Sequence, residues 1–300
     1  MDSAAIGETR AENKPTDRSV DHIVDVLIAE RAPRLTRSWV WPLAKPPLYR
    51  LLDYGRARRM ADAIAGLPGR QTLDYVSDLL ELQVTERGLE RMPARGRLVV
   101  ICNHPTGIAD GLAVYQALKR VRDDLIFYAN ADALRVSERL DEVIIPVEWV
   151  EAKRTRDKTR RTLVETKAAF EAERPIVVFP AGRIARRDAQ GQLTDPAWMP
   201  TALSLARKYA APVLPVHVTG PWSTLFHLFN RFSPELRDIT LFHELLNKRG
   251  GQFGVTVGPL IPGSAFDGDD VAATLALKHY IERVLSEDPD AAFSPVPAGP

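Results

Sequence analysis

Five short runs rich in β-branched and aromatic residues alternate with helical stretches, and this alternation constrains the fold of the chain most. The runs are LVVICN (98–103), LIFYAN (125–130), VIIPV (143–147), IVVFP (176–180) and VLPVHV (213–218), and the helical stretches lie near 108–120, 156–173 and 200–210. A last strand at 254–258 and a helix at about 270–286 complete the pattern. Such alternation is typical of parallel sheets whose faces are covered by helices. The sequence therefore predicts the α/β class, with a largely parallel central sheet flanked by helices.

The residues before this alternation predict an N-terminal helical layer. The spacing of one amphipathic helix face is followed by Val20, Ile23, Val24, Leu27 and Ile28, and similar patterns cover about 56–66 and 71–82. A proline-rich stretch at Pro42, Pro46 and Pro47 is expected to break the layer. Residues 1–18 and 287–300 are expected to be disordered tails, which leaves a helical part at 19–95 and an α/β part at 96–286.

Composition excludes several classes of protein. Cys102 is the only cysteine among the 300 residues, which rules out an internal disulfide framework and a thiolate-rich metal site. No apolar run approaches the roughly 20 residues of a membrane-spanning helix, and the first residues do not resemble a signal peptide. The net charge of +1 argues against a nucleic-acid partner. We therefore expect a cytoplasmic protein that needs no metal.

The residues that follow the strands are the candidates for chemistry, because ligands of open α/β sheets bind outside the carboxyl ends of the strands. The segment after the first strand, residues 103–111, reads NHPTGIADG and contains His104 and Asp110. These side chains can meet if His104 lies in the turn before a helix and Asp110 in its first turn. A carboxylate then orients the imidazole, and the pair can act as a general base. In the alternative interpretation, the histidine caps a strand and the acid only favours a helix start.

Two basic segments follow other strands. In FPAGRIARR (179–187), the turn at Gly182 is expected to expose backbone N–H groups beside Arg183 and Arg186, which predicts a site for a phosphate or a developing oxyanion. After the strand at 143–147, Lys153 and Arg154 begin a basic run and are expected to contact a substrate phosphate. The alternatives are an ordinary tight turn with solvated arginines and a solvated helix face.

Together with APVLPV (211–216), these segments resemble, in order and spacing, the four blocks of the glycerolipid acyltransferase superfamily over about residues 85–260. NHPTGIADG is similar to the Asn-His-Pro-x-Gly-x-x-Asp-Gly block of its hemolysin-like branch, and FPAGR to the phosphate-binding FPEGTR-type block. Besides the His104–Asp110 pair, the first block then comprises Asn103, Pro105, Thr106 and Gly107 as supporting residues. The chain departs from the superfamily at Ala181, where glutamate is usual, and at Ile184, where arginine is usual.

The resemblance implies the acyltransferase fold and an enzyme that moves a fatty acyl group from a thioester, on coenzyme A or acyl carrier protein, to the hydroxyl of a lyso-lipid. The acceptor is a lysophospholipid or, as the runner-up, a lyso-ornithine-type lipid. His104, oriented by Asp110, would remove the hydroxyl proton, and N–H groups around Gly182 or at the helix start after Thr106 would hold the oxyanion. Neither a cofactor nor a covalent intermediate is needed, and burial disfavours Cys102 as a nucleophile.

Two other functions remain open at this stage. A hydrolase would use the same base on water, although the chain has no Gly-x-Ser-x-Gly elbow. A non-catalytic lipid-binding protein would keep the fold without the reaction. A dinucleotide-binding enzyme is disfavoured, because no Gly-x-Gly-x-x-Gly follows a strand.

The N-terminal helical part has the composition of a membrane-facing surface. Eight basic residues and one acidic residue lie between 31 and 59, interleaved with aromatic and aliphatic residues, and Trp39, Trp41 and Arg50 are the expected membrane contacts. A second aromatic stretch comprises Trp222, Phe226, Phe229 and Phe232. We therefore expect a membrane-facing subdomain at 19–95, a catalytic domain at 96–286 and peripheral binding to the inner face of the membrane. Alternatively, these aromatic residues pack helices onto the sheet.

Overall fold

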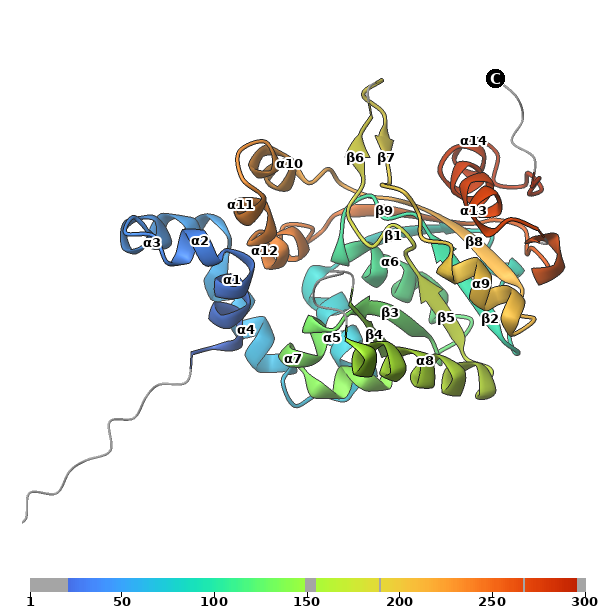
Figure 1. Ribbon diagram of the computed structural model, residues 1–300, viewed down its shortest axis with the longest axis horizontal. Coiled ribbons are helices and arrows are strands. Elements are labelled where there is room, and N and C mark those ends of the chain that lie inside the picture. Colours follow the sequence, from blue (N-terminus) through green and yellow to red (C-terminus); the bar gives the residue numbers. More distant parts are fainter. Residues whose placement is uncertain (1–20, 149–154, 189, 267, 296–300) are drawn as a thin grey trace, which may run out of the picture.

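The computed structural model describes residues 21–148, 155–188, 190–266 and 268–295 (Figure 1). The expected tail at 1–18 and the end of the expected tail at 287–300 lie outside these residues. The strands are β1 (Gln83–Arg87), β2 (Leu98–Cys102), β3 (Ile126–Asn130), β4 (Ile144–Val147), β5 (Pro175–Val178), β6 (Arg186–Arg187), β7 (Leu193–Thr194), β8 (Val213–Thr219) and β9 (Gln252–Val257).

The helices surround these strands. They are α1 (Ile23–Arg31), α2 (Pro33–Thr36), α3 (Trp41–Leu51), α4 (Tyr54–Ile64), α5 (Gly69–Leu80), α6 (Ile108–Leu118), α7 (Asp132–Val136), α8 (Arg156–Glu171), α9 (Thr201–Lys208), α10 (Thr224–Asn230), α11 (Pro234–Asp238), α12 (Leu241–Leu246), α13 (Asp270–His279) and α14 (Leu285–Glu287). Shorter turns are η1 (Leu89–Arg91), η2 (Glu138–Glu142), η4 (Gly263–Phe266) and the π-helical η5 (Tyr280–Val284).

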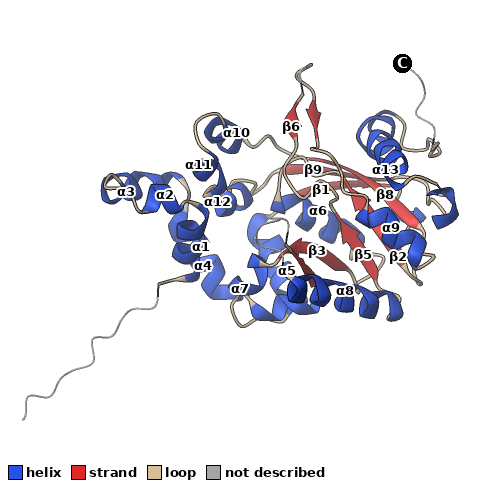
Figure 2. Ribbon diagram, in the orientation of Figure 1, coloured by secondary structure: helices blue, strands red, loops and turns tan. Residues whose placement is uncertain are grey.

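A seven-stranded sheet in the order β1-β9-β8-β2-β5-β3-β4 forms the centre of the molecule (Figure 2). The pairs from β8 to β4 are all parallel, β8 and β9 are antiparallel, and β1 is parallel to β9. The carboxyl ends of β8, β2 and β5 therefore lie side by side at one edge, whereas β9 and β1 point the opposite way. The predicted α/β fold with a largely parallel sheet flanked by helices is confirmed.

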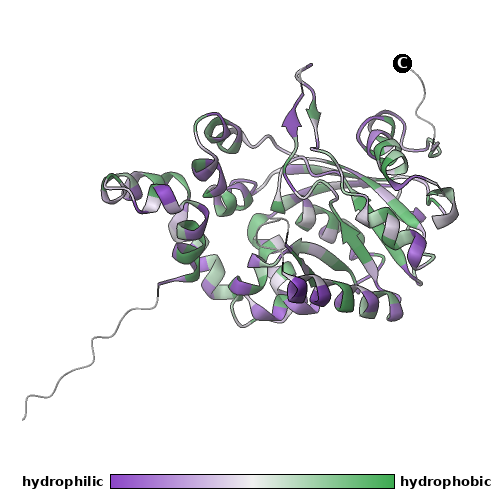
Figure 3. Ribbon diagram, viewed as in Figure 1, coloured by the Kyte–Doolittle hydropathy of each residue, from purple (hydrophilic) through white to green (hydrophobic). Residues whose placement is uncertain are grey.

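Both faces of the central strands are buried, and alternate residues of β2 contribute to different cores. Leu98, Val100 and Cys102 belong to a hydrophobic cluster that includes side chains of α4, α5, α6 and α12. Val99 and Ile101 belong to a second cluster with side chains of α8, α9 and α13. The strand has no polar face because helices cover both of its sides. Figure 3 shows the resulting concentration of hydrophobic residues in the central strands.

The N-terminal part differs from the prediction in two respects. First, β1 lies within the expected helical part, 19–95, and joins the edge of the central sheet. Its sequence, QVTER, is mostly polar, so that it lacks the apolar run by which the other strands are recognised. Second, α3 continues through Pro46 and Pro47. Proline lacks an N–H, but its fixed φ is compatible with a helix, and α3 has no buried residue that a small distortion would displace.

The C-terminal segment also differs from the expected tail. Residues 288–295 follow α14 and pack against the body of the protein. The ring of Phe293 lies 5.3 Å from that of Phe266 and 5.4 Å from that of Tyr280, measured between centroids. Asp290 forms an ion pair with Arg91. The proline- and alanine-rich composition gave no sign of these contacts, to which a hydrogen bond from Tyr280 Oη to the Ala291 carbonyl adds.

Gly88 provides a test of the β1 edge. Its φ is +78°, and a Cβ there would lie 2.2 Å from the backbone oxygen of Val257, whereas Gly96, with φ +90°, has nothing within 4 Å of the corresponding position. We expect Gly88→Ala to lower the free energy of unfolding by about 2–4 kcal/mol, because strain and a backbone clash add. Gly96→Ala should cost about 1 kcal/mol from strain alone. Urea unfolding of both variants checks this, and equal losses would contradict the clash.

Candidate active site

Three loops meet at the edge where β8, β2 and β5 end. They are residues 103–107 after β2, residues 179–185 after β5 and residues 220–223 after β8. The backbone N–H of Ala185 donates to the carbonyl of His104 at 2.9 Å, and Ser223 Oγ donates to the carbonyl of Thr106 at 3.2 Å. The loop after the central strand is thus held from both sides. The segments that the sequence places after these three strands therefore lie together at this edge.

His104 and Asp110 lie against each other in the loop after β2 and the first turn of α6. His104 Nδ1 is 2.9 Å from Asp110 Oδ2. The Asp110 side chain is fully buried, whereas 17% of the His104 side chain is exposed. This is the predicted geometry, with the histidine before the helix and the acid in its first turn. Nδ1–H faces the carboxylate, so the outer nitrogen, Nε2, is the one that can accept a proton from a bound molecule.

The buried carboxylate of Asp110 is also the cap of its own helix. Its Oδ2 accepts the backbone N–H groups of Thr106 at 2.8 Å and Gly107 at 3.0 Å, and its Oδ1 accepts the Thr106 hydroxyl at 2.5 Å. The helix N-terminus adds a favourable field for the negative charge. Gly107 has φ +108°, and a Cβ there would lie 3.0 Å from Ile184 Cδ1. The glycine of the motif is therefore required by the backbone conformation of the loop.

The ends of the loop are fixed by two further side chains. Asn103 exchanges two hydrogen bonds with the backbone of Val218 in β8, donating at 3.0 Å and accepting at 2.6 Å. The backbone N–H of His104 donates to both carboxylate oxygens of Asp195, at 3.0 and 3.1 Å. The Phe179 ring packs against the imidazole at 4.8 Å between centroids. These contacts restrict the orientation of His104 from three directions.

Asp195 was not found by sequence reasoning, and no motif marks it. It is buried, accepts the indole N–H of Trp198 at 2.9 Å, and donates its own N–H to Glu282 in η5 at 2.7 Å. Burial, together with the neighbouring Glu282 carboxylate, raises the pKa of Asp195 to about 7. Glu282 in turn accepts from Lys278 at 2.6 Å. A chain of polar contacts therefore connects the C-terminal helices to the backbone of His104.

A second buried network on the other side of the loop was also missed. Lys248 is 1% exposed, and its Nζ donates to Ser223 Oγ at 2.9 Å and to Glu244 Oε2 at 3.3 Å. Burial lowers the pKa of Lys248, which the Glu244 carboxylate opposes. Ser223 Oγ in turn donates a hydrogen bond to the Thr106 carbonyl. An isolated lysine in a sequence gives no sign that it will be buried.

The FPAGR segment forms the predicted turn, but not every predicted donor is available in it. The N–H of Gly182 donates to the Phe179 carbonyl at 3.0 Å within the turn. This N–H is therefore occupied within the turn, and the expectation that N–H groups around Gly182 hold an oxyanion stays a prediction. Arg183 is exposed, and Arg186 is partly buried at the start of the β6–β7 hairpin.

Four other residues that the sequence analysis singled out are placed as follows. Lys153 and Arg154 lie outside the described residues. Cys102 is fully buried at the end of β2, and burial raises the pKa of its thiol, which agrees with its predicted lack of nucleophilic character. Pro105 lies between His104 and Thr106 and is buried.

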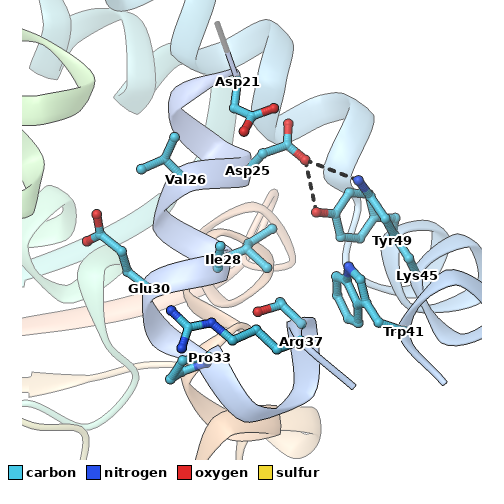
Figure 4. A pocket seen from close by; sticks show the side chains of 12 residues that line it. Asp21, Asp25, Val26, Ile28, Glu30, Pro33, Arg37, Trp41, Lys45 and Tyr49 are labelled. Carbon is cyan, nitrogen blue, oxygen red and sulfur yellow. Dashed lines mark hydrogen bonds and ion pairs between the residues drawn. The ribbon is translucent and has the colours of Figure 1, made fainter. Parts of the chain in front are cut away.

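A pocket of about 820 Å³ lies at a distance from this loop, among α1, α2 and α3 (Figure 4). Its lining includes Arg37, Trp41 and Lys45, and none of the residues from 103 to 110. Tyr49 Oη donates to Asp25 at 3.0 Å, and Lys45 Nζ lies 3.6 Å from the same carboxylate. Trp41, an expected membrane contact, thus lines a pocket, whereas Trp39 is 85% exposed and Arg50 is also exposed.

Two features are absent from the described part of the chain. None of its helices has the length and apolar character needed to cross a membrane. Among the same residues, no group of three or more His, Cys, Asp or Glu side chains is arranged to hold a metal ion.

Comparison with known proteins identifies the family. A family model described as "Acyltransferase" matches residues 26–247. The lyso-glycine lipid O-acyltransferase of Phocaeicola vulgatus is 27% identical over 205 residues, which cover 66% of this chain and 71% of that protein. Its namesake from Bacteroides thetaiotaomicron is 28% identical over 223 residues, covering 72% and 79%. The structure of the 1-acyl-sn-glycerophosphate acyltransferase PlsC of Thermotoga maritima aligns with 87% of this chain and 97% of its own, at 15% identity and a TM-score of 0.47.

The family model covers well over half of the chain, and it includes both the helical N-terminal part and the loop that carries His104 and Asp110. The predicted membership of the glycerolipid acyltransferase superfamily is confirmed, and this chain belongs to the acyltransferase family.

Proposed function

We propose that this protein transfers a fatty acyl group from an acyl thioester, on coenzyme A or acyl carrier protein, to the hydroxyl of a lyso-lipid. The observation that carries the proposal is the contact between His104 Nδ1 and the buried Asp110 carboxylate, 2.9 Å apart, with the imidazole still partly exposed. A base oriented in this way suits the deprotonation of a neutral hydroxyl. The proposal is also supported by the family to which the chain belongs.

In the proposed reaction, His104 Nε2 takes the hydroxyl proton as the acceptor oxygen attacks the thioester carbonyl. The tetrahedral intermediate then expels the thiolate, and the imidazolium returns the proton to the leaving sulfur, so that the base is regenerated. Asp110 keeps Nδ1–H in place and stabilises the transient positive charge. No acyl-enzyme is formed, and the reaction needs no cofactor.

Donors for the oxyanion are proposed at the start of α6. The first N–H groups of any α-helix lack carbonyl partners within the helix. The Asp110 carboxylate accepts the backbone N–H groups of Thr106 and Gly107, and the Asp110 backbone N–H donates to the Gly107 carbonyl. The N–H groups of Ile108 and Ala109 lie between them and are our candidates for the developing negative charge.

The proposed acceptor class follows the two relatives, both named lyso-glycine lipid O-acyltransferases. A lyso-glycine-type lipid is therefore our first candidate. A lyso-ornithine-type lipid and a lysophospholipid are the alternatives. Ala181 and Ile184, which replace the glutamate and arginine usual in the superfamily, agree with an acceptor other than a glycerol phosphate.

We further propose that the protein binds the inner face of the membrane peripherally, through the tips of α3 and α10. Four large hydrophobic residues on or beside these helices are at least 44% exposed: Trp39, Leu43, Leu228 and Phe232. Glu235 of α11 accepts the N–H groups of Arg34 and Leu35 of α2 at 3.2 and 2.8 Å, which joins the helix that follows α10 to the helix that precedes α3. Figure 1 shows both regions on the same side of the molecule. Basic residues of this part would add attraction to anionic lipids.

The central test is acyl transfer by the purified protein. With a labelled acyl thioester and a panel of lyso-lipids, we expect acceptor-dependent product, and a loss of about 10²–10⁴-fold in His104→Ala. The exposed His279, in the last turn of α13, provides the matched control, and His279→Ala should keep full activity. Acyl release that does not depend on an acceptor would indicate a hydrolase. Folded protein that binds lipid and forms no product would indicate a carrier.

Asp195 generates a prediction on stability. Because its pKa is raised to about 7, the folded protein holds a proton there that the unfolded chain releases near pH 4. Raising the pH from 5 to 8 should therefore lower the free energy of unfolding, and Asp195→Asn should remove about 2 kcal/mol of this decline. Urea unfolding at both pH values measures it. Asp78→Asn, an exposed position on α5, should behave as the wild type does; an unchanged slope in Asp195→Asn would refute the prediction.

The membrane proposal is tested with vesicles that contain anionic lipid. Trp39→Ser combined with Leu43→Ser should weaken binding about tenfold or more, because large apolar side chains lose their burial in the interface. The control combines Leu163→Ser with Val164→Ser, which removes two exposed apolar side chains from α8 and should have no effect. Binding of the wild type should also weaken with salt. Equal binding of both double variants would exclude this surface.

A further inference from the structure

The pocket of about 820 Å³ among α1, α2 and α3 has no part in the proposed reaction, because no residue from 103 to 110 lines it (Figure 4). Its volume lies within the range of pockets that bind small molecules. The lining combines aromatic, acidic and basic side chains: Trp41, Tyr49, Asp21, Asp25, Glu30, Arg37 and Lys45. Charges of both signs beside aromatic rings suit a polar ligand better than an acyl chain.

One wall of the pocket already holds an ammonium group of the chain itself. Lys45 Nζ lies 4.9 Å from the centre of the Tyr49 ring and 3.6 Å from Asp25 Oδ1. The Trp41 ring meets the Tyr49 ring edge-on, at 6.0 Å between centroids and 75° between planes. Aromatic faces beside a carboxylate suit the recognition of ammonium groups. Because the Lys45 side chain is 45% exposed and flexible, the ammonium of a ligand can take its place.

The carboxylate of this wall is held in position by two tyrosines. Asp25 accepts hydrogen bonds from the hydroxyls of Tyr49, at 3.0 Å, and of Tyr54. Burial and the Asp25 carboxylate raise the pKa of Tyr49, so that its hydroxyl remains a donor. The two tyrosine rings stack at 4.0 Å between centroids. Asp21, one helical turn before Asp25, adds a second acid at this end of the pocket (Figure 4). Two acids and one lysine therefore leave a net negative charge there.

The opposite end of the pocket is basic. Arg37, which follows α2, is exposed and lies there beyond Ile28 (Figure 4). Within the described part of the chain, its side chain forms no ion pair. Glu30, the remaining acid of the lining, accepts two hydrogen bonds from Arg135, at 2.6 and 2.8 Å. A guanidinium at one end and excess carboxylate at the other match a zwitterion that carries a phosphate and an ammonium.

The pocket lies beside the proposed membrane contact. Trp41, in its lining, lies between Trp39, which is 85% exposed, and Leu43, which is 75% exposed. Apolar side chains of an interfacial helix enter the boundary between the headgroups and the acyl chains. A pocket two residues away along the same helix therefore lies at the level of the phospholipid headgroups.

We propose that this pocket binds the headgroup of phosphatidylethanolamine, with the ammonium at Asp21 and Asp25 and the phosphate at Arg37. The ligand is a lipid of the membrane surface and not a substrate of the reaction. A primary ammonium donates hydrogen bonds to carboxylates, as Lys45 can, whereas a choline offers only the contact with the aromatic rings. The inference goes beyond the proposed acyl transfer and takes from the preceding proposals only the position of α3 at the membrane.

The soluble headgroup sn-glycero-3-phosphoethanolamine tests the pocket without a membrane and without turnover. The five tryptophans give indole N–H signals in NMR spectra, and Trp41→Phe identifies the signal of Trp41. We expect this signal to shift on titration. The signal of Trp198, which donates to Asp195 beside His104, should stay in place. The probe sn-glycero-3-phosphoglycerol, which lacks the ammonium, should bind about fivefold more weakly.

Lys45 provides the sharpest variant, because its replacement has opposite effects on the two kinds of site. Lys45→Gln removes the internal ammonium that competes with the ligand, so it should tighten binding of the ethanolamine probe. A site for the phosphate alone would lose affinity. Arg37→Gln and Asp21→Asn change exposed side chains and should each weaken binding by about two- to fivefold. Arg34→Gln, exposed on α2 and outside the lining, is the matched control and should bind as the wild type does.

The outcomes separate the possible ligands. Tighter binding of sn-glycero-3-phosphocholine, weakened by the same two variants, would support the pocket and assign it to choline lipids. Equal binding of the glycerol and ethanolamine probes, weaker binding by Lys45→Gln, or a shift of Trp198 in place of Trp41 would overturn the proposal. Vesicles in which phosphatidylethanolamine replaces phosphatidylcholine, at constant anionic lipid, should bind the wild type more tightly; no difference would exclude the lipid as the ligand. His104→Ala should bind the probe unchanged, so that a failure of the proposed acyl transfer is seen separately.

Discussion

The burial of one carboxylate at the start of α6 is the constraint on which the site depends. Asp110 is inaccessible to solvent, and an ionised group in that position is tolerated because N–H and O–H donors surround it. Those donors come from the loop after β2, so the loop must adopt the one conformation that brings them together. Helix capping and the orientation of His104 are consequences of the same contacts. Any substitution at Asp110 therefore disturbs the fold of the loop and its chemistry together.

The sheet determines which loops can assist this one. Because β2 lies between β8 and β5, the segments that follow these strands are the immediate neighbours of the loop. The segment after β5 supplies Phe179 and the contact to the His104 carbonyl, and the segment after β8 supplies Ser223. Parts of the chain separated by about a hundred residues thus act on one histidine. The two polar networks behind them, around Asp195 and Lys248, hold the loop from opposite sides.

Sequence reasoning predicted most of the sheet and the geometry of the His104–Asp110 pair, because both leave local signals. Buried parallel strands appear as apolar runs, and a histidine and an acid around Pro and Gly restrict the turn between them. β1 left no such signal, since an edge strand of mixed polarity resembles a loop. Asp195 and Lys248 could not be found either, because their role arises from contacts with residues distant in the chain. The hydrogen bond of the Gly182 N–H within its own turn was not foreseen either, because the sequence shows the turn but not its hydrogen bonds.

Because β8 and β9 are antiparallel, β9 and β1 run in the direction opposite to β2. β1 leads into η1, where Arg91 pairs with Asp290. The segment that contains Phe293 is therefore fastened at the β1 side of the sheet, and Figure 1 shows α14, which precedes it, on the side of the molecule opposite to α3. A fluorescent reporter or an immobilisation handle attached to this segment would leave α3 uncovered. The protein can thus be tethered to a sensor surface in a defined orientation, with the exposed tip of α3 pointing outward.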